Sequence, residues 1–167
     1  MSCKSRKRVP LKRYVAKLTE TVIDHCCKQF GYSKKPILKE RQMPNSFYAF
    51  QANDRKRQRY VIYYNYRMFL DFCKGDSSID SLVYLIVSTA AHECRHYYQY
   101  RQICSKKPRE SEETIAAWKY DYEHYEEKSS AENTLEIDAS DFSYKYMEEY
   151  FGLKGLKEAV ENIEKEV

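Results

Sequence analysis

Glycine and proline, the residues that most often interrupt secondary structure, are scarce in this sequence. Its 167 residues include 4 Gly and 4 Pro, against 17 Tyr and a hydrophobic share of 43%. This composition disfavours a disordered chain and favours long helices with few tight turns around a single core. We therefore expect one domain that spans residues 1–167.

Long apolar segments are also absent. The longest apolar run, SLVYLIVSTAA, is too short to cross a bilayer. The basic start, MSCKSRKRVPLKRY, is not followed by the apolar stretch that a secretory signal requires. We expect a cytoplasmic protein with no membrane partner, in which residues 1–9 form a flexible basic tail.

The sequence also lacks the closely spaced cysteine pairs that bind a structural metal. The six cysteines contain no Cys-x-x-Cys pair, and Cys26 and Cys27 are adjacent. This spacing indicates neither a zinc ribbon nor a disulfide framework. We expect reduced thiols, most of them buried as small side chains.

Charge is unevenly distributed along the chain, although the net charge is only +4. Residues 1–75 hold 18 Lys and Arg against 5 Asp and Glu, whereas residues 76–167 hold 11 against 20. Two oppositely charged solvated faces explain this pattern without any partner, and we favour that interpretation. An anionic partner, either nucleic acid or an acidic protein, is the weaker hypothesis, and the cluster NDRKRQR is its best candidate contact.

The first half of the chain predicts one helix followed by three strands. From Pro10, apolar residues recur at three- and four-residue steps up to Cys26, and Gly31 is a plausible helix end. Three short runs rich in Ile, Val, Tyr and Phe follow, namely PILKER, SFYAFQA and RYVIYYNYRMF. We interpret these runs as an antiparallel three-stranded meander.

The second half predicts helices only. The segment IDSLVYLIVSTAAHECRHYYQYRQ is expected to form the central buried helix, because its first half is nearly all apolar and CKGDSS offers an N-cap. Further helices are expected over 111–127, over 131–151 up to Gly152, and over 153–167. The fold class is therefore α+β.

The segment HECRH, within the predicted central helix, carries the chemistry. Positions i and i+4 of a helix lie on the same face, so His92 and His96 can present two imidazoles to one ion, with Glu93 beside them. Alternatively, neighbouring tyrosines satisfy both histidines and Glu93 is solvated. That alternative poorly explains why ionisable residues directly continue an apolar run, since burial without a partner is costly.

A catalytic zinc site needs a third protein ligand. The segment ENTLEIDASDF offers Glu132 and Glu136, which are four residues apart and would share one helix face, and His124 is a further candidate.

An HExxH helix followed by E-x-[DE]-A-x-x-F on a later helix resembles the gluzincin zinc metallopeptidases, in particular the small ImmA/IrrE-type peptidases. The segment EIDASDF matches the second motif from Glu136, and the expected order of elements also looks like the core of that family. The resemblance implies a zincin-like fold with Zn²⁺ held by His92, His96 and Glu136. If ENTLE is the matching motif instead, Glu132 is the ligand. Two positions depart from the family pattern, Arg95 and Ser140.

The activity implied by the resemblance is hydrolysis of a peptide bond in a protein or peptide substrate. Glu93 is then expected to activate the metal-bound water as general base. One edge strand, SFYAFQA or RYVIYYNY, is expected to pair with an extended substrate. The competing hypothesis is a non-catalytic regulator with a zincin fold, which binds an acidic protein or nucleic acid through its basic N-terminal half; the intact Glu93 favours the peptidase.

Overall fold

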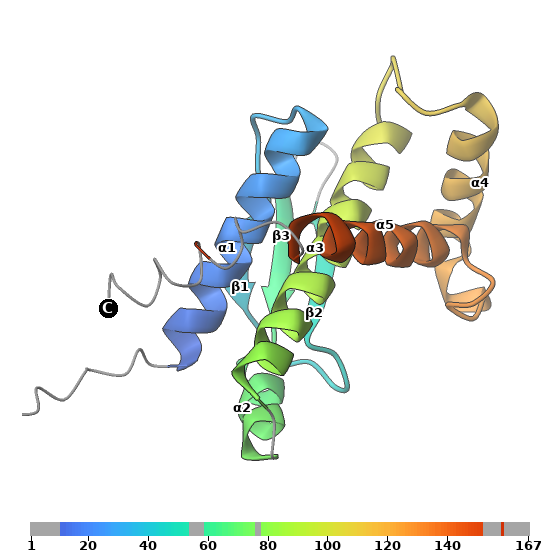
Figure 1. The fold of residues 1–167 in the computed structure, drawn as a ribbon. Helices are drawn as coiled ribbons and strands as arrows, with labels where there is room; N and C mark the ends of the chain where they lie inside the picture. Colours follow the sequence, from blue (N-terminus) through green and yellow to red (C-terminus); the bar gives the residue numbers. More distant parts are fainter. Residues whose placement is uncertain (1–10, 54–58, 76–77, 152–157, 159–167) are drawn as a thin grey trace, which may run out of the picture.

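Helices pack against one small sheet in the computed structural model of the protein, which describes residues 11–53, 59–75, 78–151 and 158 (Figure 1). The elements are α1 (Leu11–Phe30), β1 (Ile37–Glu40), β2 (Tyr48–Asn53), β3 (Arg59–Tyr64), α2 (Tyr66–Lys74), α3 (Ile79–Ile103), α4 (Glu112–Glu123), a 3₁₀ turn (Tyr125–Glu127) and α5 (Thr134–Phe151). The fold class is α+β, as predicted.

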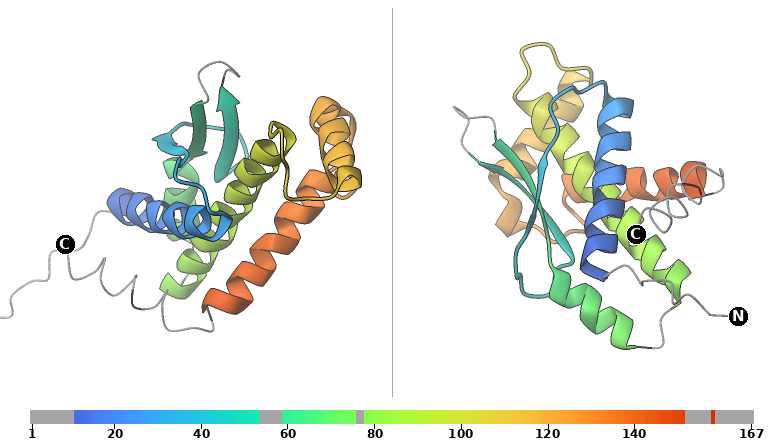
Figure 2. Two further views of the ribbon diagram at one scale, coloured as in Figure 1. Left: turned by 90° about the horizontal axis from the view of Figure 1, so that it is seen from above. Right: turned by 90° about the vertical axis from the view of Figure 1, so that its left-hand side faces the viewer.

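Helices α1 and α3 lie together on one face of the sheet, and α5 crosses α3 (Figures 1 and 2). The apolar stripe predicted for α1 is buried from Val15 to Cys26, and the helix ends at Phe30, directly before Gly31, which has a φ of +68°. Positive φ costs glycine little, so Gly31 is suited to this stop. One cluster of buried side chains joins α1, the sheet and the three helices α3, α4 and α5.

The predicted antiparallel meander is wrong, because the sheet is mixed. Its strand order is β1-β3-β2, with β3 antiparallel to β2 and parallel to β1. The seven residues 41–47 between β1 and β2 are long enough to let β3 insert between those two strands. Strand patterning indicates which faces are apolar but not which strands are neighbours.

The run RYVIYYNYRMF also differs from its prediction as a single strand. It divides at Asn65: β3 ends at Tyr64 and α2 begins at Tyr66. The buried Asn65 side chain donates to the carbonyls of Met43 and Ser46, so it ties the β1–β2 link to the end of β3. Tyrosine favours strands by propensity, but this tertiary contact and the burial of Phe69 favour the helix.

The central position of α3 is confirmed. Its N-cap is Ser78, whose side chain accepts a hydrogen bond from the Ser81 backbone, and the helix packs against α1, β2, α4 and α5. Among the described residues, no helix has the length and apolar character needed to cross a bilayer.

The later helices are shorter than predicted. The predicted helix over 111–127 ends at Glu123, before the 3₁₀ turn, and the predicted helix over 131–151 begins only at Thr134. Three predicted segments lie outside the described residues: the tail 1–9, most of the NDRKRQR cluster, and the helix over 153–167 except for residue 158.

Candidate metal centre

The crossing of α3 and α5 brings His92, His96 and Glu136 together. The Nε2 atoms of the two histidines lie 3.0 Å apart, and each lies 3.2 Å from a different carboxylate oxygen of Glu136. The three side chains are 14–21% exposed, so the group is partly shielded but open to solvent on one side.

These residues fit a zinc ion by donor type and by spacing. Two imidazole nitrogens and one carboxylate are a common ligand set of catalytic zinc. Ligand atoms at about 2.1 Å from one tetrahedral zinc would lie roughly 3.4 Å from each other, close to the 3.0–3.2 Å observed. Among the described residues, a search for three or more His, Cys, Asp or Glu side chains close enough to share a metal ion gives this group.

Electrostatics of the group favour a charged carboxylate. Close contacts with the rings of His92 and His96 hold the pKa of Glu136 far below its ordinary value. For His96, burial acts to lower the pKa, but the Glu136 carboxylate and the nearby Glu93 raise it overall. A carboxylate that stays ionised between two imidazoles is a suitable third ligand.

Glu93 lies next to this group in a different environment. Burial raises its pKa above the ordinary value, although the two histidines and the backbone N–H of Phe50 favour its charged form. A carboxyl group with a raised pKa accepts a proton more readily near neutral pH than an exposed glutamate does. Glu93 therefore has the character of a general base.

The alternative ligand Glu132 lies elsewhere. It is exposed in the turn before α5, where its carboxylate accepts a hydrogen bond from Ser129 at 2.7 Å. The expectation that Glu132 and Glu136 share a helix face is wrong, because the helix begins at Thr134. His124 ends α4 instead and its Nδ1 lies 2.8 Å from the Tyr120 carbonyl, so it is not part of the group.

The sequence did not point to two residues that contact Glu136 or the start of its helix. The hydroxyl of Tyr125, in the 3₁₀ turn, donates to Glu136, and burial together with this bond raises the pKa of Tyr125. Asp121, at the end of α4, accepts hydrogen bonds from the backbone and the hydroxyl of Thr134, the first residue of α5. No spacing rule marks either residue, and Tyr125 is one of several tyrosines in this part of the chain.

Two cavities flank the metal centre. One, of about 710 Å³, extends from His96 and Glu136 toward Tyr122–Glu127; the other, of about 420 Å³, lies between Tyr84 and Tyr144. Both are lined by His92, Glu93, Ser46 and Tyr48. Strand β2 pairs with β3 on one side, and its other edge faces this double cavity.

The cysteines are free, as expected, in the part of the chain that is described. Cys26, Cys27 and Cys94 are buried, whereas Cys73 and Cys104 are exposed. Cys94, inside the HECRH segment, faces Cys26 of α1 rather than the histidines. It packs in the core and is not a ligand candidate.

Comparison with known proteins gave no match: no family model, no curated protein and no solved structure matches this chain. What the chain does is therefore inferred from its own residues.

Proposed function

We propose that this protein is a zinc-dependent peptidase with a zincin-like fold, in which His92, His96 and Glu136 hold the metal. The observation that carries this proposal is the convergence of two imidazoles on one carboxylate beside the half-buried Glu93: the Nε2 atoms of His92 and His96 lie 3.0 Å apart, and each lies 3.2 Å from a separate oxygen of Glu136. When bound, zinc supplies a Lewis acid that polarises a carbonyl and lowers the pKa of water.

Glu93 performs the proton transfers in this proposal. Its carboxylate accepts the proton of the attacking water and returns it to the amine nitrogen that leaves when the peptide bond breaks. The raised pKa of Glu93 suits both steps, because the group must hold the proton briefly and then release it.

The substrate in this proposal is an extended segment of a protein or peptide. The exposed edge of β2 offers backbone groups for pairing, and cavities extend from the metal centre in both directions along it. A cleft that continues past the centre on both sides favours cleavage within a chain over removal of a terminal residue. Of the two strands expected to serve, SFYAFQA contains the edge strand, while RYVIYYNY forms the middle of the sheet.

A peptide-library digestion tests the proposal. Zinc-loaded wild-type protein and the Glu93→Gln variant are each incubated with peptides derived from a whole proteome, and new termini are identified by mass spectrometry. We expect cleavage within peptides by the wild type and none by the variant. Zinc binding without any cleavage by the wild type would favour the non-catalytic regulator, and absence of zinc binding would reject both.

A further inference from the structure

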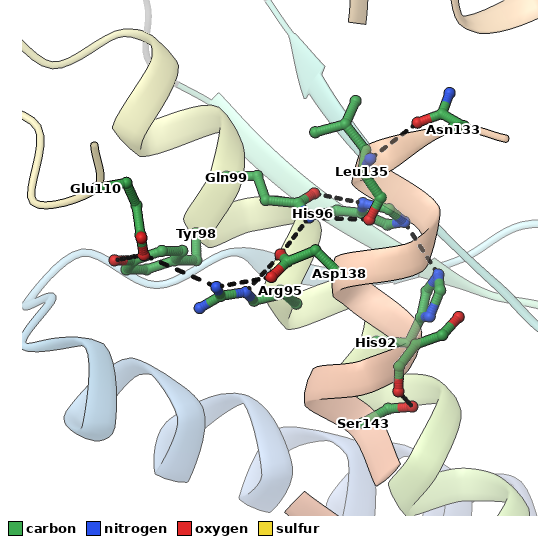
Figure 3. A network of polar contacts seen from close by, with 11 residues as sticks. His92, Arg95, His96, Tyr98, Gln99, Glu110, Asn133, Leu135, Asp138 and Ser143 are labelled. Carbon is green, nitrogen blue, oxygen red and sulfur yellow. Dashed lines mark hydrogen bonds and ion pairs between the residues drawn. The ribbon is translucent and has the colours of Figure 1, made fainter. Parts of the chain in front are cut away.

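A buried amide contacts the second histidine of the candidate metal centre from behind. Gln99 lies one helical turn after His96 on α3, and its side chain is 1% exposed. Its Oε1 lies 2.9 Å from Nδ1 of His96, and its Nε2 lies 2.9 Å from the Leu135 carbonyl and 2.7 Å from Asp138 Oδ2 (Figure 3).

These partners leave only one orientation for the amide. A backbone carbonyl and a carboxylate accept hydrogen bonds and donate none, so the NH₂ group of Gln99 must face Leu135 and Asp138. Its carbonyl oxygen then faces His96 and can only accept. The ring proton of His96 is therefore held on Nδ1, which leaves the lone pair of a neutral ring on Nε2, the atom that faces Glu136.

Asp138 is itself held in place by Arg95. Two parallel hydrogen bonds join the guanidinium to the carboxylate, at 2.8 and 3.0 Å (Figure 3). The guanidinium also packs over the rings of Tyr98 and Trp118, at 4.4 and 5.6 Å from their centroids. Arg95 and Gln99 are four residues apart on α3, so together they clamp Asp138, which follows the ligand Glu136 by two residues on α5.

We infer that Gln99, held by Asp138 and Arg95, is a positioning residue that fixes the ring proton of His96 on Nδ1 and thereby sets the zinc affinity of the site. The inference rests on the proposed zinc site. It also gives Arg95, which departs from the family pattern, a role: the same clamp that orients Gln99 fixes the helix that carries Glu136. Hydrogen-bond partners behind a metal ligand commonly change metal affinity by about 10- to 100-fold.

The test compares the zinc dissociation constants of two matched variants, measured on the purified full chain by competition with a chromophoric chelator. Gln99→Leu removes the amide behind His96. Gln102→Leu removes an amide from the same helix that is also buried but contacts Tyr32 and Arg109 instead. We expect Gln99→Leu to weaken zinc binding by about 10- to 100-fold and Gln102→Leu to leave it unchanged, although both lower the melting temperature of the zinc-free protein.

A second pair of variants distinguishes loss of the contact between residues 99 and 138 from misfolding of the whole protein. Gln99→Glu still accepts the proton of His96 but repels Asp138, so it should weaken zinc binding. Adding Asp138→Asn restores a donor toward residue 99, and the double variant should bind zinc more tightly than Gln99→Glu alone. If residues 99 and 138 acted independently of each other, the two losses would add.

The outcomes separate this inference from the proposed function. If the wild type binds no zinc, both are overturned. If the wild type binds zinc, and Gln99→Leu binds it as tightly as Gln102→Leu does or the double variant is weaker than Gln99→Glu, only the positioning role of Gln99 is overturned.

Discussion

Nε2 of His92 and Oε2 of Glu136 lie 3.2 Å apart, although 44 positions separate the two residues in the sequence. Their approach depends on the way α5 crosses α3, because His92 lies in the second half of α3 and Glu136 in the first turn of α5. Any change that shifts either helix should therefore be visible as a change in metal binding.

Loss of either residue should remove the metal. We expect about one zinc per chain in the wild type and almost none in His92→Ala or Glu136→Ala, as measured by elemental analysis. Zinc at about 100 times its dissociation constant should stabilise the wild type by about 3 kcal/mol, and this stabilisation should vanish in both variants. The control is Glu132→Ala, which should keep its zinc; loss of zinc there but not in Glu136→Ala would show that the third ligand is misassigned.

Replacement of the general base should separate binding from chemistry. Glu93→Gln keeps the size of the side chain and leaves all three ligand candidates intact, so zinc content should stay at the wild-type level. Cleavage of a peptide found by library digestion should fall by about a hundred- to ten-thousand-fold. Glu113→Gln, which changes an exposed glutamate in the first turn of α4 that lines neither cavity, serves as the control. Wild-type turnover by Glu93→Gln would contradict the peptidase proposal.

The hydroxyl of Tyr125 should stabilise the metal centre through Glu136. Tyr125→Phe removes the donor that contacts this carboxylate while the ring remains, so zinc affinity should weaken by about 10-fold. The matched change is Tyr120→Phe, in a nearby exposed tyrosine whose ring stacks on His124. Chelator competition measures both, and equal affinities would show that Glu136 needs no support from the 3₁₀ turn.

Stability in acid should depend on Asp121. Burial acts to raise the pKa of this carboxyl, but the hydrogen bonds from Lys128 and Thr134 outweigh it and hold the pKa below the ordinary value of 3.8. A folded-state pKa below the unfolded one stabilises the protein above the unfolded value, and this contribution is lost as the pH falls through the lower folded value. In the zinc-free protein, we expect the contribution of Asp121 to the free energy of unfolding to be constant above about pH 5 and to decline below about pH 4.

The variant Asp121→Asn should reveal that contribution directly. It should lower the free energy of unfolding at neutral pH by about 1–3 kcal/mol, because Lys128 and Thr134, the first residue of α5, lose a charged acceptor. Denaturant unfolding at several pH values measures it, with the exposed Asp141→Asn as control. The difference between wild type and Asp121→Asn should shrink as the pH falls from 5 to 3; a difference that grows instead would contradict the role given to Asp121.

The sequence by itself determined the features that depend on local periodicity. The apolar stripe of α1, its stop at Gly31, the central position of α3 and the pairing of His92 with His96 on one face all follow from helical spacing, since neighbours along a helix are fixed by the 3.6-residue repeat. The choice of Glu136 over Glu132 came from resemblance to a motif, and spacing alone left it open.

Only the tertiary structure decided which distant segments meet. The link over residues 41–47 allows β3 to lie between β1 and β2. At Asn65, a run of strand-forming residues ends, because a contact with a distant part of the chain outweighs local propensity. The same holds at the metal centre. Asp121 accepts the hydrogen bond at the start of α5, and Arg95 and Gln99 both donate to Asp138. These polar contacts between helices do not recur at a fixed sequence spacing, so no pattern along the chain predicts them.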